Sequence, residues 1–520
     1  MLLQLLFGLH VQLQSQYTTS ATPYSGIDKF LGIPFGKAPI GNLRFNLPEA
    51  VDAYTGTIEA IEFGPACPQQ EIKLPILDGL PQEAVDYILN SIYNVVFPSD
   101  EDCLSINVVR PSNVSETSNL PVVVIGGTSM YDGASIVSRS VELGEPVVYV
   151  SMNYRVSAFG FLASQEVKDA GVGNLGLLDQ RLALRWIQKY IAVFGGNPEK
   201  VTIWGESAGA ISVASQMLMN DGDNEGLFHA GFMQSGSPIP VGDITHGQAD
   251  YDTLVEKTGC SGEDDTLACL REVDYDTLKA AVDDSPFVFD YQALLLAWLP
   301  RADGLVFSDN PQKLVQAGKI ANVPIVNGDV DDEGTLFSLS QLNVTTDDEF
   351  RTYLSNVFLQ GAGSDEDIDT ILGLYPSDPS VGSPYDTGSA NAITPQFKRI
   401  ASFQGDAVFQ GPRRFFLNAL SGKTDVWSYA HKKLKGVPVL GSFHASDVLD
   451  VYGGGDLVDY LVHFATHLDP NGANSTAWPK WTSASPQLLS INDIGVTVID
   501  DTFRQDAIET LTGILLNNPV

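Results

Sequence analysis

The chain has 520 residues, of which 44% are hydrophobic and 18% are charged, so it is long enough and apolar enough to bury a large globular core. Its formal net charge is −35, and so acidic a surface repels nucleic acid and anionic membranes, although the plainer interpretation is that the charge serves solvation; no nucleic-acid partner is expected. After residue 9, no stretch is long and apolar enough to be a transmembrane helix.

The N-terminal stretch Met1–Leu9 is apolar and short, without a basic segment before it or a small-residue cleavage site after it. We interpret residues 1–9 as a leader or the remnant of one. Residues 10–520 contain no internal repeat, low-complexity tract or linker, so we expect them to form a single domain.

The cysteines and sequons favour a secreted protein. The four cysteines include no C-x-x-C pair and no zinc-type spacing, and they fall into two sequence-local pairs, as loop-closing disulfides do. Three N-x-S/T sequons, at Asn113, Asn343 and Asn474, are candidate glycosylation sites. An even number of cysteines together with sequons is typical of an oxidising, extracellular setting.

Taken in chain order, the first elements are an edge strand at Val11–Ser15 and a segment, residues 68–102, between Cys67 and Cys103. This segment begins polar and then places apolar residues at helical spacing, from Ala84 to Ile92. One interpretation is an amphipathic surface helix packed on the core. The other is a mobile flap whose apolar side covers a hydrophobic pocket or meets a lipid surface.

Apolar strands and amphipathic helices then alternate along the chain. Strands are predicted at Leu120–Ile125, at Pro146–Val150 and at Val201–Trp204, and a helix at Asp179–Tyr190. Further strands are expected near Phe232, at 323–327 and at 426–429. This alternation predicts an α/β fold with a mainly parallel sheet covered by helices on both faces.

The strongest chemical signal is Gly205-Glu206-Ser207-Ala208-Gly209, which fits G-x-S-x-G between a predicted strand and the predicted helix Ala210–Met219. A serine at the tip of so sharp a turn is held above the sheet edge, and the two glycines let strand and helix pass closely. The helix N-terminus below the serine supplies free N–H groups. Ser207 is therefore the predicted nucleophile, in preference to a chance Gly/Ser turn.

A serine hydroxyl needs a general base, and His444 is the best-placed candidate. His10, His229 and His246 precede the strand expected to carry the acid, and His431 lies in a basic run expected to be solvated. His463 and His467 share a helix face, but the glutamate of H-E-x-x-H and a third metal ligand are missing, so we expect packing or capping roles. His444 follows an apolar segment in a loop, where the base of a nucleophile-elbow fold belongs.

The acid is expected after a strand between Ser207 and His444. The strand at 323–327 leads into an acidic turn with Asp329, Asp331, Asp332 and Glu333. The residues alone do not choose among these four carboxylates, and a solvated acidic turn is the alternative interpretation.

Several motifs, in order from about Phe30 nearly to the C-terminus, make the chain resemble the type-B carboxylesterase/lipase family, which includes the cholinesterases. It is most similar to the secreted fungal lipases and sterol esterases of that family. The motifs are Phe194-Gly-Gly-Asn-Pro198 through Gly209, Glu101-Asp-Cys-Leu104, Asn174-Leu-Gly-Leu-Leu-Asp-Gln180, Gln234-Ser-Gly236, Asp332-Glu-Gly334 and Phe443-His444.

The resemblance implies an α/β-hydrolase fold with Glu333 as the acid and His444 as the base. It also implies the disulfides Cys67–Cys103 and Cys260–Cys269, the first of which anchors a lid at residues 68–102. Arg44 and Glu101 match a structural ion pair, and Ser235 matches a polar position near the acid.

The oxyanion hole needs N–H donors preorganised around the tetrahedral intermediate. Ala208, directly after the nucleophile, is one expected donor. By resemblance Gly127 and Thr128 are the others, although the family has a glycine where this chain has Thr128, and a β-branched residue resists a positive φ.

The sequence therefore predicts a secreted serine hydrolase that cleaves esters of long-chain fatty acids, as a triacylglycerol lipase or sterol esterase does, at a lipid–water interface and without metal or cofactor. Two alternatives stay open: an esterase for smaller soluble esters, and a catalytically impaired, cholinesterase-like adhesion protein. The residues do not indicate an oligomeric state. Apolar residues proposed to line an acyl pocket are Phe287, Phe289, Leu294, Leu295, Leu296, Trp298, Leu336 and Phe337.

Overall fold

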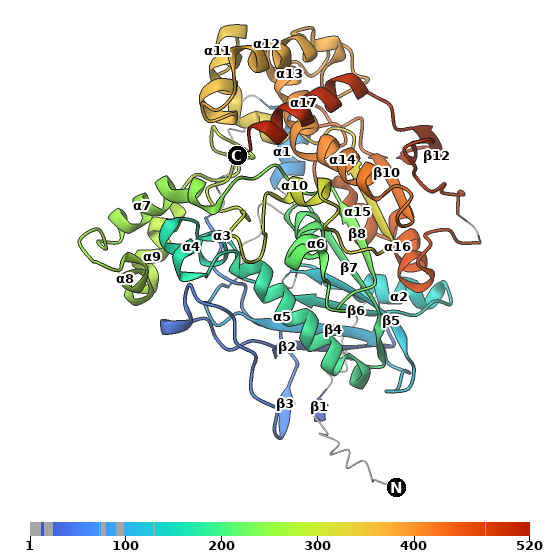
Figure 1. Cartoon of the computed structure of the whole chain (residues 1–520). Helices are drawn as coiled ribbons and strands as arrows, with labels where there is room; N and C mark the ends of the chain where they lie inside the picture. The colour runs from blue at the N-terminus through green and yellow to red at the C-terminus, as the bar shows by residue number, and fades with distance from the viewer. Residues whose placement is uncertain are drawn as a thin grey trace.

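A computed structural model describes residues 12–14, 24–71, 73, 80–89, 98–127, 130–473 and 475–519 (Figure 1). Ten strands form one sheet in the order β12-β11-β10-β9-β8-β7-β5-β6-β4-β2, and β1 pairs with β3 apart from it. The strands are β1 Gln12–Gln14, β2 Ile27–Pro34, β3 Thr57–Glu59, β4 Ser105–Pro111, β5 Leu120–Gly126, β6 Val148–Met152, β7 Gly196–Glu206, β8 Ala230–Gln234, β9 Ile325–Val330, β10 Val426–Lys432, β11 Gln487–Asn492 and β12 Gly495–Asp500.

The α-helices lie between and after these strands. They are α1 Gln82–Leu89, α2 Ala134–Glu142, α3 Ser157–Phe161, α4 Gln165–Ala170, α5 Leu175–Tyr190, α6 Ala208–Leu218, α7 Gln248–Lys257, α8 Thr266–Glu272, α9 Tyr275–Asp283, α10 Pro311–Gln316, α11 Asp347–Tyr353, α12 Asp365–Leu374, α13 Phe397–Gly405, α14 Gly411–Leu420, α15 Ser446–Tyr452, α16 Asp456–His467 and α17 Gln505–Asn517.

The middle of the sheet is parallel and its two edges are antiparallel. Strands β6, β5, β7, β8, β9, β10 and β11 pair in parallel. At one edge β4 and β2 run antiparallel, and at the other β12 does. This arrangement is the α/β class that the alternating pattern predicts.

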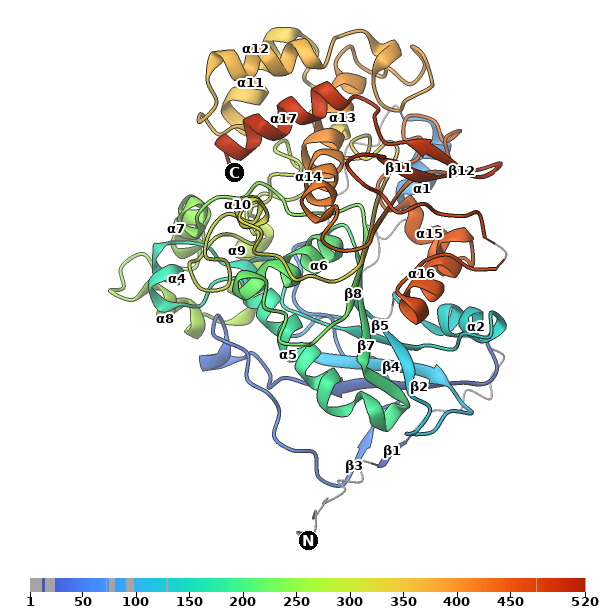
Figure 2. The same cartoon turned by 45° about the vertical axis from the view of Figure 1, so that its right-hand side comes forward.

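Both faces of the central strands are buried, which explains why they read as continuous apolar runs rather than alternating ones. In β5, Val122 and Val124 belong to one hydrophobic cluster, whereas Val123 and Ile125 belong to a second cluster on the other face. Figure 2 shows α5 and α6 over the first face and α2 and α16 over the second.

The predicted elements are present, with shifted ends. The predicted helix Asp179–Tyr190 lies within α5, which begins at Leu175, and the strand predicted at Pro146–Val150 is β6, Val148–Met152. The prediction that His431 is solvated is wrong. This residue lies inside β10 and is 1% exposed, and burial lowers its pKa.

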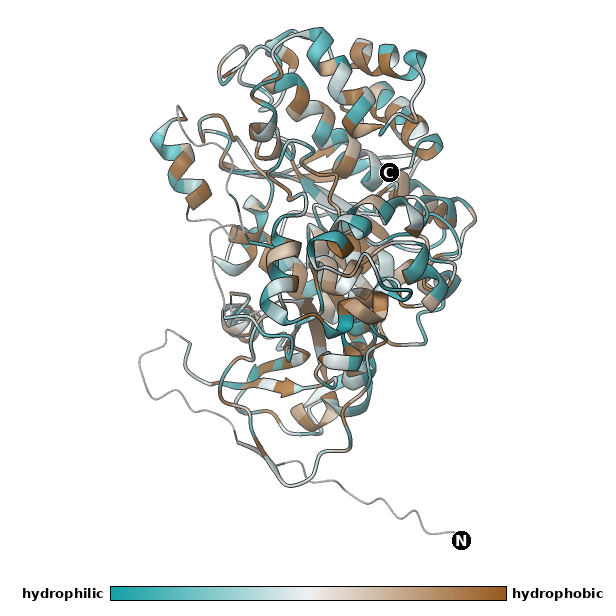
Figure 3. Ribbon diagram, turned by 90° about the vertical axis from the view of Figure 1, so that its left-hand side faces the viewer, coloured by the Kyte–Doolittle hydropathy of each residue, from teal (hydrophilic) through white to brown (hydrophobic). Residues whose placement is uncertain are grey.

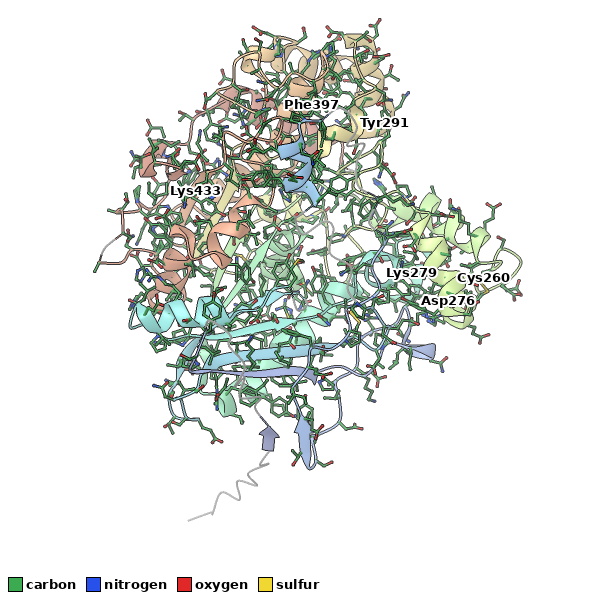
Figure 4. All side chains as sticks on the ribbon, turned by 180° about the vertical axis from the view of Figure 1, so that it is seen from behind. Cys260, Asp276, Lys279, Tyr291, Phe397 and Lys433 are labelled. Carbon is green, nitrogen blue, oxygen red and sulfur yellow. A yellow bond between two sulfur atoms is a disulfide. The ribbon has the colours of Figure 1, made fainter. Side chains whose placement is uncertain are left out.

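Two disulfides join the pairs that the family resemblance implies. Cys67 bonds to Cys103 across 36 residues, and Cys260 bonds to Cys269 across nine. The second bridge ties the region between α7 and α8, in a lobe that extends to one side of the molecule and carries Cys260, Asp276 and Lys279 (Figure 4). Among the described residues no helix is long and apolar enough to cross a membrane.

Candidate active site

The candidate site lies at the ends of three parallel strands of the sheet, β7, β9 and β10. Ser207 directly follows β7, Glu333 lies in the turn after β9, and His444 lies in the loop between β10 and α15. Strands β7, β8, β9 and β10 are neighbours in the sheet and run in the same direction, so their carboxyl ends share one edge. In open α/β sheets, ligands bind outside this edge.

Ser207 has the strained backbone expected of a nucleophile elbow. Its φ and ψ are 54° and −119°, and its N–H donates to the Gln234 carbonyl at 2.9 Å. A Cβ added to Gly205 would overlap the backbone of Gly209, which explains the first glycine of the motif. A Cβ added to Gly209 would meet nothing within 4 Å, so close packing does not explain the second.

A continuous chain of hydrogen bonds joins the three predicted residues. His444 Nε2 lies 2.7 Å from Ser207 Oγ, and His444 Nδ1 lies 2.6 Å from Glu333 Oε2. The other oxygen of Glu333 accepts from the Val330 N–H at 2.8 Å. His444 and Glu333 are buried, so the low local dielectric strengthens these contacts.

Burial also shifts the pKa values of the two buried groups. It lowers the pKa of His444, and the nearby Glu206 carboxylate opposes this shift. It raises the pKa of Glu333 well above its usual value, while the Ser235 hydroxyl and the Val330 N–H lower it. A neutral His444 can accept the Ser207 proton at Nε2 while Nδ1–H donates to Glu333.

Glu206 is a further member of the site, and no role was predicted for it. Its Oε1 lies 3.4 Å from His444 Nε2, on the side of the imidazole that faces Ser207. Burial raises the pKa of Glu206 to about 8, and the carboxylates of Asp447 and Glu333 act in the same direction. Its position directly before the nucleophile could have marked Glu206 as part of the site. The burial of its side chain, however, cannot be predicted from its place in the sequence.

The other carboxylates of the acidic turn face elsewhere, and none is solvated. Asp329 pairs with Arg413 at 2.9 Å, and Asp331 pairs with Lys435 at 2.5 Å. Asp332 accepts four hydrogen bonds, and none of the four donors belongs to Ser207 or to the His444 ring. Glu333 is thus the one carboxylate of the four that bonds to His444.

The oxyanion-hole prediction needs a correction at Gly127. Its N–H donates to the Met152 carbonyl at 2.8 Å, because the parallel pairing of β5 with β6 continues one residue past Gly126. The Gly127 N–H is therefore already bonded within the sheet and does not serve as a free donor in this structure. Ala208 lies directly after the nucleophile as the first residue of α6. Thr128 lies outside the described residues.

Apolar side chains gather beside His444. Phe337 and Phe409 pack on its ring, with centroid distances of 5.0 Å and 4.7 Å. Phe337 in turn stacks on Phe289, which contacts Phe287. Phe409 is an addition that the sequence did not suggest, because nothing local marks its orientation.

Helix α1 covers this aromatic cluster. Ala84 and Ile88 of α1 are buried in the same cluster, and the Tyr87 ring lies 5.8 Å from that of Phe443, the residue before His444. Figure 4 shows α1 beside Phe397, another member of the cluster. Of the predicted lining residues, this cluster contains Phe287, Phe289, Leu294, Leu336 and Phe337, whereas Leu295, Leu296 and Trp298 lie outside it.

Comparison with known proteins agrees with this geometry. Residues 12–507 match the carboxylesterase family. The chain belongs to the carboxylesterase family. This carboxylesterase is 45% identical to Lipase 2 of Diutina rugosa over 508 residues, which cover 93% of this chain and 92% of that one. It is 39% identical to the secreted triacylglycerol lipase LIP1 of Gibberella zeae, over 93% of this chain and 86% of that one.

The crystal structure of Aspergillus niger EstA superposes on this carboxylesterase with a TM-score of 0.77 and 27% sequence identity, covering 95% of this chain and 96% of that one. The chain thus has the α/β-hydrolase fold, and it is a carboxylic ester hydrolase. The implied Arg44–Glu101 pair is also present, buried and bidentate, with both N–O distances at 2.6 Å.

The remaining sequence candidates in this carboxylesterase have structural partners or lie at the surface. His463 and His467 both contact Glu145, at 2.8 Å and 3.1 Å. Across the part of the chain that the structure describes, no three His, Cys, Asp or Glu side chains are arranged to hold a metal ion. Asn113 and Asn343 are exposed, and Asn474 lies outside the described residues.

Proposed function

We propose that this carboxylesterase is a lipase that hydrolyses esters of long-chain fatty acids, triacylglycerols among them, through an acyl-enzyme on Ser207. The observation that carries the proposal is the unbroken chain Glu333–His444–Ser207, with distances of 2.6 Å and 2.7 Å. The apolar cluster packed on His444 supports a long acyl chain over a short polar one.

In the acylation step, Ser207 Oγ attacks the ester carbonyl and transfers its proton to His444 Nε2. Glu333 accepts the hydrogen bond from Nδ1–H and stabilises the imidazolium that forms. The negative oxygen of the tetrahedral intermediate accepts hydrogen bonds from the backbone N–H groups of Ala208 and Thr128. His444 then protonates the leaving alcohol, and the acyl group stays on Ser207.

Deacylation reverses these roles with water as the nucleophile. His444 Nε2 removes a proton from water as the water attacks the acyl carbonyl, and it returns this proton to Ser207 Oγ as the fatty acid leaves. The reaction uses no metal or organic cofactor. Burial favours the neutral form of His444, which is the form that must accept the proton in both steps.

The loop between Cys67 and Cys103 acts as the lid in this proposal. Its helix α1 places Ile88 and Ala84 on the apolar cluster beside His444, so moving α1 aside would open the cluster to a lipid surface. The disulfide holds the two ends of the loop together while its middle moves. Residues 82–89 are the described helical part of this lid.

Secretion and glycosylation belong to the proposal too. The relative from Gibberella zeae is named as secreted, and the two disulfides suit an oxidising compartment. The exposure of Asn113 and Asn343 supports both as glycosylation sites, with Asn474 as the third.

The proposal is tested by initial rates on p-nitrophenyl esters of increasing acyl length, below and above the solubility of each ester, with Ser207→Ala as the blank. We expect the rate to rise with acyl length and to increase sharply once the ester forms an interface. A smooth hyperbola that favours short acyl groups would instead assign an esterase for soluble substrates. No rate above the blank would contradict ester hydrolysis and favour a binding or adhesion protein.

A further inference from the structure

Asp332 lies in the turn that carries the acid and bonds to the loop that carries the base. We infer that Asp332 is a positioning residue, which holds the Glu333 turn and the His444 loop in register and so sets the hydrogen bond between them. This inference rests on the proposed function. It assigns a role to a carboxylate that the relay Ser207–His444–Glu333 does not use.

One side of Asp332 binds the His444 loop twice. Its backbone N–H donates to the Ser442 carbonyl at 3.0 Å, and its Oδ2 accepts from the Ser442 N–H at 2.9 Å. Oδ2 also accepts from Lys435 Nζ at 2.7 Å. Ser442 precedes His444 by two residues and Asp332 precedes Glu333 by one, so these bonds hold the segments immediately before the reacting side chains.

The other side of Asp332 binds a third segment. Its Oδ1 accepts from Ser383 Oγ at 3.0 Å and from the Tyr385 N–H at 2.8 Å. Four donors from two other chain segments thus converge on one fully buried carboxylate. An ionised carboxylate can accept all four, because it offers lone pairs on both oxygens and no competing hydrogen.

The surroundings leave little room for another arrangement. Gly441 has a φ of 61°, and a Cβ there would overlap Asp332 Oδ2, so the His444 loop approaches the carboxylate as closely as a backbone can. Asparagine in place of Asp332 would point an N–H₂ group at two donors or lose the contacts of Ser383 and Tyr385. A small displacement of either loop would lengthen the 2.6 Å bond between Glu333 and His444.

The test compares Asp332→Asn with a matched control, Asp331→Asn. Asp331 is the adjacent residue, is buried, and pairs with the same Lys435 at 2.5 Å, as well as with Lys432 at 3.1 Å. Both variants therefore remove one buried charge from the same lysine, and in both we expect a lower melting temperature. Only the first variant disturbs the bonds of Asp332, because an amide has one oxygen and cannot accept from both the Ser442 N–H and the Tyr385 N–H.

Three readouts separate positioning from loss of folded protein. The first is kcat per active site, counted by titration with a p-nitrophenyl phosphonate. The second is the acid limb of the kcat/KM profile. The third is the far-downfield proton resonance of the His444 Nδ1–H, which reports its bond to Glu333 without any turnover and so tests the inference even if the proposed function fails.

In Asp332→Asn we expect kcat per site to fall by on the order of ten- to a hundredfold with KM nearly unchanged, because displacement of a catalytic group has effects of that size. The acid limb should move to lower pH, since a looser Glu333 contact stabilises the imidazolium less. The downfield resonance should shift upfield or broaden. Asp331→Asn should keep all three readouts close to wild type.

Ser383→Ala is a milder second variant in case Asp332→Asn does not fold. It removes one of the four donors and is expected to change the same readouts in the same directions by a smaller factor. If both Asp332→Asn and Ser383→Ala match Asp331→Asn in kcat per site, acid limb and downfield resonance, Asp332 has no positioning role. A wild-type enzyme without turnover, but with a resonance that Asp332→Asn abolishes, would overturn the proposed function alone.

Discussion

Four ionisable side chains, Glu206, Glu333, His444 and Asp447, share the buried space behind Ser207, and burial acts on three of them in a direction that favours neutrality. It raises the pKa of Glu206 and Glu333 and lowers that of His444. The imidazole lies between two carboxyl groups, with its Nδ1 2.6 Å from Glu333 Oε2 and its Nε2 3.4 Å from Glu206 Oε1. Each charge that forms during the reaction is then stabilised by a group already in place.

This burial predicts a pH-dependent stability. The folded pKa of Glu206 is about 8 against a usual value of 4.5, so between these values the unfolded chain loses a proton that the folded chain keeps. The free energy of unfolding should thus fall as pH rises from 4.5 to 8. Since one pKa unit corresponds to about 1.4 kcal/mol, Glu206 contributes a decrease of a few kcal/mol at most.

Glu206→Gln should flatten this decrease, because a glutamine has no proton to lose. We expect its melting temperature relative to wild type to be a few degrees higher at pH 8 than at pH 5, measured by differential scanning calorimetry. Glu199→Gln is the control, because Glu199 lies on the same strand and is exposed. Equal pH dependence in wild type and Glu206→Gln would contradict the raised pKa.

Among the single residues of the site, Ser207 and His444 could be predicted from the sequence, because a nucleophile elbow and a loop after a strand are local patterns. Glu333 could not be distinguished from Asp329, Asp331 and Asp332 by its neighbours alone. The four differ in tertiary contacts: Arg413 binds the first, lysines the second, and backbone donors from distant loops the third. Only the family resemblance chose Glu333, which is the carboxylate that lies 2.6 Å from His444 Nδ1.

At the scale of single elements, helix α1 is amphipathic, and its apolar side packs on the cluster beside His444. Hydropathy colouring shows hydrophobic and hydrophilic residues alternating along the helices of the molecule, as an α-helix with one covered side requires (Figure 3). In α1, Ile88 is 1% exposed against the cluster beside His444, whereas its neighbour Leu89 is 39% exposed. The two adjacent positions offer a matched pair of variants.

Ile88→Ser should weaken the docking of α1, since it removes a buried apolar side chain worth about 2 kcal/mol or more. We expect a several-fold higher rate on a medium-chain ester kept below its solubility, and a smaller increase when the interface forms. Leu89→Ser, which leaves the buried side unchanged, should keep the wild-type rate below solubility. Equal rates for the two variants would show that α1 is a fixed part of the core.

The strands and helices were predictable because both faces of the sheet are buried and the apolar runs are therefore continuous. The residue at which the pairing of two strands ends was not predictable. The pairing of β5 with β6 continues through the Gly127 N–H, which the sequence assigns to the oxyanion hole. Likewise His431 reads as part of a basic run, but β10 carries it into the interior. Both outcomes depend on where a neighbouring strand ends, which is not a local property.

At the scale of the whole molecule, the net charge of −35 should govern which lipid surfaces the enzyme reaches. On triacylglycerol droplets coated with anionic phosphatidylglycerol, we expect a low rate at about 10 mM salt and a higher one at about 150 mM, because the Debye length falls from about 30 Å to about 8 Å. Droplets coated with zwitterionic phosphatidylcholine should show little salt dependence.

A short, fully soluble ester serves as the control for this experiment, because its hydrolysis involves no charged interface. Its rate should be the same at both salt concentrations. If the two droplet types behave alike at low salt, the acidic surface does not control interfacial binding, and a local patch must face the lipid instead.

The central claim is that Ser207, activated by His444, attacks esters of long-chain acids. The measurement that tests it most directly is covalent labelling by a long-chain p-nitrophenyl alkylphosphonate, followed by mass spectrometry of the peptide that contains Ser207. We predict one equivalent of p-nitrophenol released per folded chain and the phosphonyl group on Ser207, with no labelling in Ser207→Ala or His444→Ala. Absence of label in the wild type, or equal label in Ser207→Ala, would contradict the claim.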